Sequence, residues 1–366
     1  MPLNLGSHDY VQTLKGQTLI FPNLDELFKS WPTGISPYYK GLRRRYGNEL
    51  AKIYGKGSKH YEVLMAVDVS LLASIWAPYA SVDRLPAFQG QASFLYVFDD
   101  ELDTPIHSDL LYDLDAGNRF RAKTIAYMKS ILGDNPKGSA STAEANSRKS
   151  SLPANLELAI QSFGAVAKPI APFLTKRQRE LYLQANISYV NGTGEEQRVE
   201  LSGCAPNIGE YMGIRAATGG VKSMIAVLEY ALEIDLEDEI GYDPDVDTLY
   251  EEANIIIFLC NDLFSLRREL AYPFYCNSVA VLYHEHKDLQ VAVDETFKMI
   301  SDSKSMFDAT ANRLLERYDS HPKLDALEAL VNGLKLMSTG NVAWSKQAKR
   351  YSLGVEKFDG ATSITI

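Results

Sequence analysis

The stretch LYEEANIIIFLCNDLFSLRREL, residues 249–270, decides the fold. Its apolar residues recur every three or four positions, which is the spacing of a helix, and the run IIIFLC indicates that this helix is buried. The same spacing is present at residues 60–79, 89–102, 156–173, 176–189, 207–216, 221–234, 292–317 and 322–336. Roughly ten helices without intervening strands predict an all-α domain built as a helical bundle.

The composition is that of an ordinary globular protein. Of the 366 residues, 46% are hydrophobic and 23% are charged, and the net charge of -10 has the wrong sign for a protein that binds nucleic acid through its phosphates. No uncharged apolar run is long enough to span a membrane, and the first residues lack the pattern of a signal peptide. Three scattered cysteines, Cys204, Cys260 and Cys276, predict neither a disulfide framework nor a zinc site. We therefore expect a cytoplasmic protein that binds neither nucleic acid nor membrane.

Three segments differ from the helical pattern. Residues 1–40 contain Pro22, Pro32 and Pro37 among large aromatic residues, which predicts a strap over the core. Residues 134–153 are rich in Ser, Ala, Asn and Gly and almost lack large apolar residues, which is typical of a flexible loop. Residues 352–366 are interpreted as a C-terminal tail.

The first acidic motif is FDDELD, residues 98–103. On a helix, Asp99 and Asp103 lie one turn apart on the same face, and Leu95 and Tyr96 place apolar bulk one turn earlier. Carboxylates at the mouth of an apolar wall suit Mg²⁺, which proteins hold through one or two carboxylates together with substrate phosphates. The alternative is a solvated acidic helix end, and this motif alone favours neither.

The second motif is NDLFSLRRE, residues 261–269. Asn261, Ser265 and Glu269 recur four residues apart, so their oxygen atoms follow one stripe of a helix. Ile257 and Phe258 precede them by one turn and repeat the apolar-to-polar arrangement of the first motif. A solvent-facing polar stripe is the alternative, but polar groups on a buried helix require partners. The pattern favours a second site for a hard cation.

Three arginines suit an anionic ligand. Arg215 precedes the paired glycines of AATGG, which can interrupt a helix and expose backbone groups. Arg268 lies in the second motif, and Arg350, followed by Tyr351, comes shortly after the sequence GNVAWS. Arginine binds phosphate oxygens through a planar fork and keeps its charge. Each arginine alone is typical of a protein surface, but together with the two acidic motifs they favour a diphosphate.

Taken in order, FDDELD, Arg215, NDLFSLRRE, GNVAWS and the pair Arg350 and Tyr351 resemble the motifs of class I terpene synthases, and more narrowly those of fungal and bacterial sesquiterpene synthases. The resemblance extends from about residue 76 to residue 351 and implies an all-α bundle around a central apolar cavity. Length alone suggests about 2.4 domains. Because all the motifs must converge on one pocket, we expect a single domain over residues 1–366.

The resemblance implies a role for each motif residue. Three Mg²⁺ ions would be bound by Asp99, Asp100, Asp103, Asn261, Ser265 and Glu269. Arg215 matches the arginine that senses the diphosphate, and Thr218 and Gly219 match the positions that help to trigger ionisation. Further contacts to the diphosphate would come from Arg268, Arg350 and Tyr351. Two positions depart from the family, since Arg268 replaces the usual lysine and Thr218 replaces an acidic residue that is common in bacterial members.

The implied activity is the Mg²⁺-dependent ionisation of an acyclic prenyl diphosphate, with the C15 substrate farnesyl diphosphate favoured, followed by cyclisation to a sesquiterpene. The cavity that holds the carbocation is expected to be lined by Trp76, Leu95, Tyr96, Ile257, Phe258 and Trp344. The alternatives are a C20 diterpene cyclase, a prenyl-chain-elongating transferase and a non-catalytic helical carrier of apolar ligands. An elongating transferase would carry two aspartate-rich motifs, whereas this chain carries one. Both a monomer and a homodimer fit the sequence.

Overall fold

Helices dominate the computed structural model, which describes residues 13–103, 109–133, 152–270, 277–348, 351 and 362–366. The first half of the chain contains α2 (Leu24–Leu27), α3 (Tyr39–Tyr54), α4 (Lys59–Val67), α5 (Val69–Trp76), α6 (Leu85–Asp103), η2 (Asp109–Tyr112), α7 (Leu114–Leu132), α8 (Ala154–Ile170) and η3 (Ala171–Phe173). The second half contains α9 (Lys176–Ser202), α10 (Ile208–Thr218), α11 (Val221–Leu232), α12 (Glu237–Gly241), α13 (Pro244–Glu269), α14 (Ser278–His286), α15 (Leu289–Arg317) and α16 (Leu324–Gln347).

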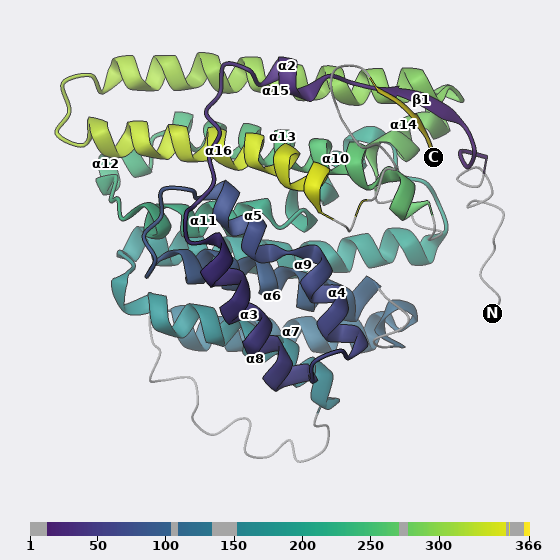
Figure 1. Ribbon diagram of the computed structural model, residues 1–366, viewed down its shortest axis with the longest axis horizontal. Coiled ribbons are helices and arrows are strands. Elements are labelled where there is room, and N and C mark those ends of the chain that lie inside the picture. Colours follow the sequence, from purple (N-terminus) through teal and green to yellow (C-terminus); the bar gives the residue numbers. More distant parts are fainter. Residues whose placement is uncertain (1–12, 104–108, 134–151, 271–276, 349–350, 352–361) are drawn as a thin grey trace.

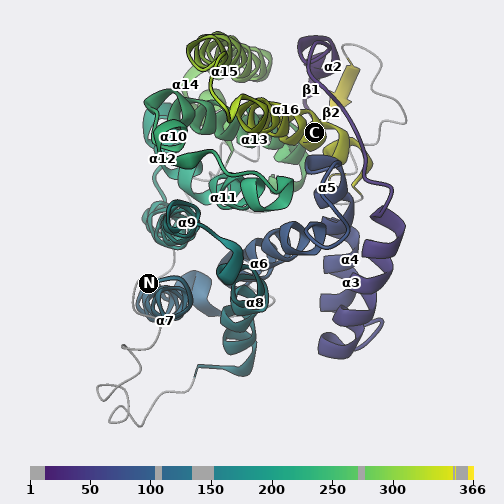
Figure 2. The ribbon, with the colours of Figure 1, turned by 90° about the vertical axis from the view of Figure 1, so that its left-hand side faces the viewer.

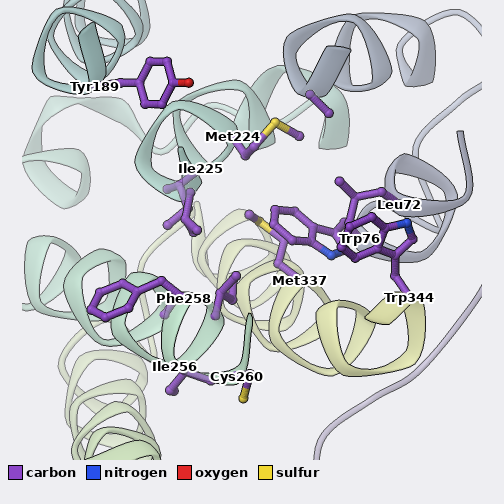
Figure 3. Packing of buried hydrophobic residues seen from close by; sticks show 14 of the residues in the cluster. Leu72, Trp76, Tyr189, Met224, Ile225, Ile256, Phe258, Cys260, Met337 and Trp344 are labelled. Carbon is purple, nitrogen blue, oxygen red and sulfur yellow. The ribbon is translucent and has the colours of Figure 1, made fainter. Parts of the chain in front are cut away.

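The long helices surround one continuous cluster of buried apolar side chains. α13 packs against α15 and α16, and these three helices run side by side in Figure 1. α6 packs against α5, α8 and α11, while α9 packs against α7, α10 and α11. Figure 3 shows Met224 and Ile225 of α11, Phe258 of α13 and Trp344 of α16 among the side chains of this cluster. The expected all-α fold is therefore confirmed, and no helix among the described residues is long and apolar enough to cross a membrane.

The helical spacing at residues 60–79 corresponds to two helices, α4 and α5, which meet at Asp68. Asp68 adopts a left-handed backbone conformation with φ of 52°, and its carboxylate accepts a hydrogen bond from the Leu71 N–H as the N-cap of α5. The Tyr39 hydroxyl and the Arg43 Nε, both on α3, donate to the same carboxylate at 2.7 and 2.8 Å. These contacts come from another helix, so the local apolar spacing could not predict the break.

Two short strands were also missed by the helical prediction. β1 (Thr18–Phe21) pairs antiparallel with β2 (Thr362–Thr365), with Thr18 opposite Thr365. β1 packs against α15, as the two views in Figures 1 and 2 show, and the Phe21 ring lies 4.9 Å from the Phe264 ring of α13. The predicted strap at residues 1–40 thus contains a strand that pairs with the C-terminal tail. Residues 1–12, residues 352–361 and most of the predicted loop at 134–153 lie outside the described residues.

A cluster of charges fastens the start of α13 to α15. Asp243 is the N-cap of α13 and accepts a hydrogen bond from Arg317 of α15. Asp245 accepts hydrogen bonds from Arg313 and Arg317. These hydrogen bonds, first that from Arg313, lower the pKa of Asp245 below its ordinary value. The pairing therefore fixes the end of α13 that lies far from the Asn261 motif.

This cluster leads to a prediction about acid stability. Because the pKa of Asp245 is lower in the folded chain than in the unfolded one, its contribution is present above about pH 4 and is lost as the pH falls through the folded-state pKa. We expect the free energy of unfolding, measured with urea at several pH values, to fall less steeply below about pH 4 in Asp245→Asn than in the wild type. Parallel curves for the two proteins would show that Asp245 adds nothing to the pH dependence of stability.

Candidate active site

The candidate site is a cavity of about 200 Å³ between α5, α6, α9, α10, α11, α13 and α16. Its apolar lining includes all six residues expected from the sequence, namely Trp76, Leu95, Tyr96, Ile257, Phe258 and Trp344. Its polar lining includes Asp99, Asp100, Glu196, Glu200, Arg215, Asn261, Arg268, Glu269, Asn341 and Tyr351. The acidic motif on α6 and the polar stripe on α13, far apart in sequence, therefore border the same cavity.

The apolar wall is held by contacts between neighbouring helices. Trp344 is 1% exposed, and its indole Nε1 donates a hydrogen bond to the Val67 carbonyl at 3.0 Å. The Tyr96 ring lies 6.5 Å from the Trp344 ring. Asn341, which precedes Trp344 in GNVAWS, donates to the Ile257 carbonyl of α13 at 3.0 Å. This asparagine was not singled out from the sequence, although it joins α16 to the helix of the second motif.

Some residues of the first motif line the cavity and others lie in the protein interior. Asp99 and Asp100 line the cavity. Phe98 is buried and stacks on Phe120 of α7 at 4.9 Å. Glu101 is 6% exposed and accepts a hydrogen bond from Asn155 of α8, and its burial raises its pKa to about 7. Asp103 is the last residue of α6, and its side chain lies outside the described part of the chain.

The three residues of the second motif differ in their positions. Asn261 and Glu269 line the cavity. Ser265 is 1% exposed and is not part of the cavity surface, and its hydroxyl donates to the Asp262 carbonyl at 3.5 Å. The Asn261 Nδ2 donates to the Tyr351 hydroxyl at 2.7 Å, which connects this motif to the C-terminal pair. Arg350 itself lies outside the described residues.

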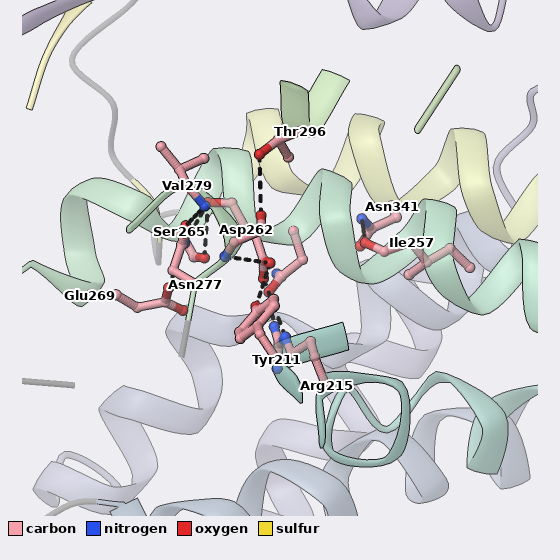
Figure 4. A network of polar contacts seen from close by, with 12 residues as sticks. Tyr211, Arg215, Ile257, Asp262, Ser265, Glu269, Asn277, Val279, Thr296 and Asn341 are labelled. Atoms are coloured by element: carbon pink, nitrogen blue, oxygen red, sulfur yellow. Dashed lines mark hydrogen bonds and ion pairs between the residues drawn. The ribbon is translucent and has the colours of Figure 1, made fainter. Parts of the chain in front are cut away.

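Arg215 is fixed by the helix that carries the second motif. Its Nη2 donates to the Asn261 Oδ1 at 2.8 Å, and its Nε donates to the Asp262 Oδ1 at 3.2 Å. Burial disfavours the charged guanidinium, but the surrounding negative charges, first that of Asp262, together outweigh this effect, so the pKa of Arg215 lies well above its ordinary value. Figure 4 shows Arg215 and Tyr211 reaching from α10 toward Asp262. The Arg215 guanidinium is therefore charged and held in place before any ligand binds.

Asp262 is the main residue that the sequence reading missed. It is fully buried and accepts hydrogen bonds from the Tyr211 hydroxyl at 2.5 Å and from the Ser278 N–H at 3.1 Å, in addition to Arg215. Burial raises its pKa to about 6, although Arg215 acts in the opposite direction. The sequence did contain a signal for Asp262. It follows the apolar run IIIFLC, and a carboxylate on so apolar a helix requires a cationic or hydrogen-bonding partner.

The helix break after Arg215 brings backbone to the cavity. α10 ends at Thr218, and Gly220 has a φ of 72°, a conformation that favours glycine. A Cβ atom on Gly220 would lie 2.9 Å from the Leu95 Cδ1, so the Leu95 side chain would have to shift to admit a larger residue here. The buried amide of Asn254 on α13 donates to the Ala216 carbonyl at 2.9 Å and supports the break from behind. Thr218, Gly219 and Gly220 all line the cavity.

The donor atoms fit a hard divalent cation. Among the described residues, no three His, Cys, Asp or Glu side chains form a group that could hold a metal ion. The described lining of the cavity nevertheless supplies carboxylate and amide oxygens from Asp99, Asp100, Asn261 and Glu269 and contains no thiol or imidazole. Oxygen ligands of this kind suit Mg²⁺ when a phosphate completes the coordination.

A helical bundle whose apolar cavity is bordered by these two motifs has the arrangement expected of a class I terpene synthase. The profile of the family described as "Terpene synthase family 2, C-terminal metal binding" matches residues 92–304. The chain is also 31% identical to the sesquiterpene cyclase hepA of Aspergillus oryzae over 94% of this chain and 92% of that protein. The chain therefore belongs to terpene synthase family 2, and the family's metal-binding domain implies a divalent metal.

Other known proteins are similar over nearly the whole chain. A (1R,4R,5S)-(-)-guaia-6,10(14)-diene synthase of Fusarium proliferatum is 25% identical over 98% of this chain and 86% of its own length. The crystal structure of an α-eudesmol synthase superposes with a TM-score of 0.70 at 19% identity, covering 87% of this chain and 97% of that one. A linalool/nerolidol synthase from Streptomyces clavuligerus superposes with a TM-score of 0.70 at 17% identity, covering 88% and 98%. At these identities the two structures establish the fold alone.

Proposed function

We propose that this protein is a metal-dependent terpene cyclase that ionises an acyclic prenyl diphosphate and cyclises the resulting carbocation to a sesquiterpene. One observation carries the proposal: Asp99 and Asp100 of α6, Arg215 of α10, and Asn261 and Glu269 of α13 border one apolar cavity. The names of the relatives from Aspergillus oryzae and Fusarium proliferatum support a terpene product. The relative from Aspergillus oryzae is a sesquiterpene cyclase, which favours the C15 substrate farnesyl diphosphate.

The metal is proposed to be Mg²⁺, with three ions as the resemblance implies. The residues that would hold it are Asp99, Asp100, Asp103, Asn261, Ser265 and Glu269. Of these, Ser265 would have to turn its hydroxyl from the Asp262 carbonyl toward the cavity. When bound, Mg²⁺ supplies positive charge that stabilises the departing diphosphate. The oxygen-only donor set of the described lining supports a hard cation over a softer one.

The positively charged and hydroxyl-bearing residues are proposed to bind the diphosphate. Arg215, Arg268 and Tyr351 border the cavity, and Arg350 precedes Tyr351 in the chain. A guanidinium can donate two parallel hydrogen bonds to phosphate oxygens, and such bonds strengthen in a site that excludes water. Arg215 reaches the diphosphate by giving up its hydrogen bond to Asn261, while Asp262 retains the Nε side of the guanidinium. Thr218 and Gly219 are proposed to assist ionisation at the helix break.

The apolar wall is proposed to fold the substrate and to stabilise the cation. Aromatic faces attract a cation by about 0.5–2 kcal/mol each and do not react with it as nucleophiles. Trp76, Tyr96, Phe258 and Trp344 offer such faces around the cavity, and Leu95 and Ile257 fill the space between them. Because the Trp344 N–H is bonded to the backbone of Val67, that tryptophan is held in one orientation.

Replacing one aromatic residue tests this role. We expect Tyr96→Leu to lower turnover by about two- to thirty-fold and to increase the share of acyclic products, because the cation loses one stabilising face. Tyr96→Phe, which keeps the ring, is the matched control and should retain the wild-type products. Products are measured by gas chromatography and mass spectrometry. An unchanged product profile in Tyr96→Leu would contradict a role for this ring in cyclisation.

A panel of substrates tests the proposed function as a whole. The purified protein is incubated with Mg²⁺ and with the C10, C15 or C20 prenyl diphosphate, and extracts are analysed by gas chromatography and mass spectrometry. We expect cyclic C15 products from farnesyl diphosphate to dominate. Cyclic C20 products would instead indicate a diterpene cyclase, longer prenyl diphosphates would indicate an elongating transferase, and unchanged substrate would indicate a carrier of apolar ligands.

A further inference from the structure

Glu269 occupies a position that needs support. It is the last residue of α13, and it lines the cavity as one of the candidate metal ligands. The final residues of a helix lack part of the regular hydrogen bonding and fray readily. A metal ligand in this place therefore requires a second group that holds its carboxylate in one orientation.

Asn277 is the group that contacts it. Asn277 is 1% exposed and forms the N-cap of α14, where its Oδ1 accepts a hydrogen bond from the Val279 N–H at 3.0 Å. Its Nδ2 donates to the Glu269 Oε2 at 2.8 Å and to the Asp262 carbonyl at 2.7 Å. The oxygen and both hydrogens of the amide are thus used, and Figure 4 shows the amide lying between Glu269 and Asp262.

The two donated bonds exceed what an N-cap requires. A cap needs only a side-chain oxygen, which Ser, Thr or Asp would supply equally well. The side-chain amide of asparagine offers an acceptor for the cap together with two hydrogens for other acceptors. The neighbouring Ser278 N–H donates to the Asp262 carboxylate, so the start of α14 is fastened to α13 at two points. Asn277 is therefore held firmly and can fix a third group.

We propose that Asn277 is a positioning residue that orients Glu269 for metal binding. The inference rests on the proposed function, since it assumes that Glu269 is a metal ligand. By donating to Oε2, Asn277 selects one rotamer of the carboxylate at the end of α13 and directs the group along the cavity edge. The role explains why an asparagine, and not another capping residue, stands at this position.

The test measures metal binding without turnover. Asn277→Ser keeps a capping oxygen but removes both amide hydrogens, and Asn277→Asp keeps the shape of the side chain, removes the same hydrogens and adds a negative charge beside Glu269. Binding of Mn²⁺ to the full chain, in the presence of inorganic diphosphate, is followed by electron paramagnetic resonance of the free ion. We expect the affinity for Mn²⁺ to fall by about ten- to a hundred-fold in both variants. Asn23→Ser is the matched control, because Asn23 caps the short helix α2 away from the cavity.

A second comparison separates positioning from folding. If Asn277 acts through Glu269, then Asn277→Ser has no further effect on Mn²⁺ affinity in a Glu269→Gln background, and thermal unfolding shows that each variant is folded. An equal loss of Mn²⁺ affinity on Asn277→Ser in the wild type and in Glu269→Gln would overturn the proposal. It would also be overturned if Asn277→Ser bound Mn²⁺ as tightly as the wild type. If the wild type itself binds no Mn²⁺ with diphosphate, the proposed function fails and this inference fails with it.

Discussion

We expect Asn261→Ala to lower kcat/KM by about a thousand-fold or more while the protein stays folded. Asn261 is a candidate metal ligand, and it is also bonded to the two candidate diphosphate-binding residues Arg215 and Tyr351. Alanine removes both hydrogen bonds together with the ligand oxygen. The loss of stability should be limited to about 1 kcal/mol for each hydrogen bond, because this side chain borders the cavity and water can replace the partner.

Product formation by gas chromatography and mass spectrometry, together with the thermal unfolding midpoint, measures the two effects separately. Asn48→Ala serves as the matched control, since Asn48 is exposed on α3, and it should retain both activity and stability. Substantial turnover in Asn261→Ala would rule out the proposed role of this residue.

The second large effect is expected for Asp262→Ala, and it falls on stability as well as on activity. Asp262 is fully buried and is paired with Arg215, whose side chain is 15% exposed. Removing Asp262 leaves a largely enclosed guanidinium without its counter-charge and leaves the Tyr211 hydroxyl without its acceptor. Breaking a buried ion pair in this way costs about 3–5 kcal/mol. Activity should fall in addition, because Arg215 loses the contact that orients it.

Urea unfolding of Asp262→Ala, Asp262→Asn and the wild type measures this cost. Asp262→Asn keeps an acceptor of similar shape and should lose less stability than Asp262→Ala. Asp302→Ala, which breaks an exposed ion pair with Lys298 on α15, is the control and should change the free energy of unfolding by no more than about 1 kcal/mol. Equal unfolding midpoints for Asp262→Ala and the wild type would contradict the importance of this buried pair.

The helices could be predicted from the sequence for a physical reason, and the meeting of the two motifs was implied by the family resemblance. Helical spacing is a local property, so α13 could be recognised from its own residues, including the stripe that carries Asn261. The resemblance ordered the motifs around one cavity, and the structure places Asp99, Arg215, Asn261 and Glu269 on its border. The break at Asp68 and the pairing of β1 with β2 depend on contacts between distant segments, which local spacing does not contain.

The supporting residues of the site were harder to predict than its candidate ligands. A search for oxygens spaced four residues apart selects Asn261 and Glu269 but passes over Asp262, which lies on another face of the same helix. Ser265 fits the spacing, yet its hydroxyl is turned toward the Asp262 carbonyl. Asn277 precedes α14, so no periodicity marks it, and its bond to Glu269 becomes visible only when α13 and α14 are packed together.

The most direct test of the central claim is the release of diphosphate from farnesyl diphosphate by the purified protein. With Mg²⁺ present, we expect one diphosphate to be released for each C15 product formed. Release should stop once EDTA has removed the metal and should recover when Mg²⁺ is restored. Release that continues unchanged in EDTA, or the absence of release with Mg²⁺ present, would contradict a metal-dependent ionisation at this cavity.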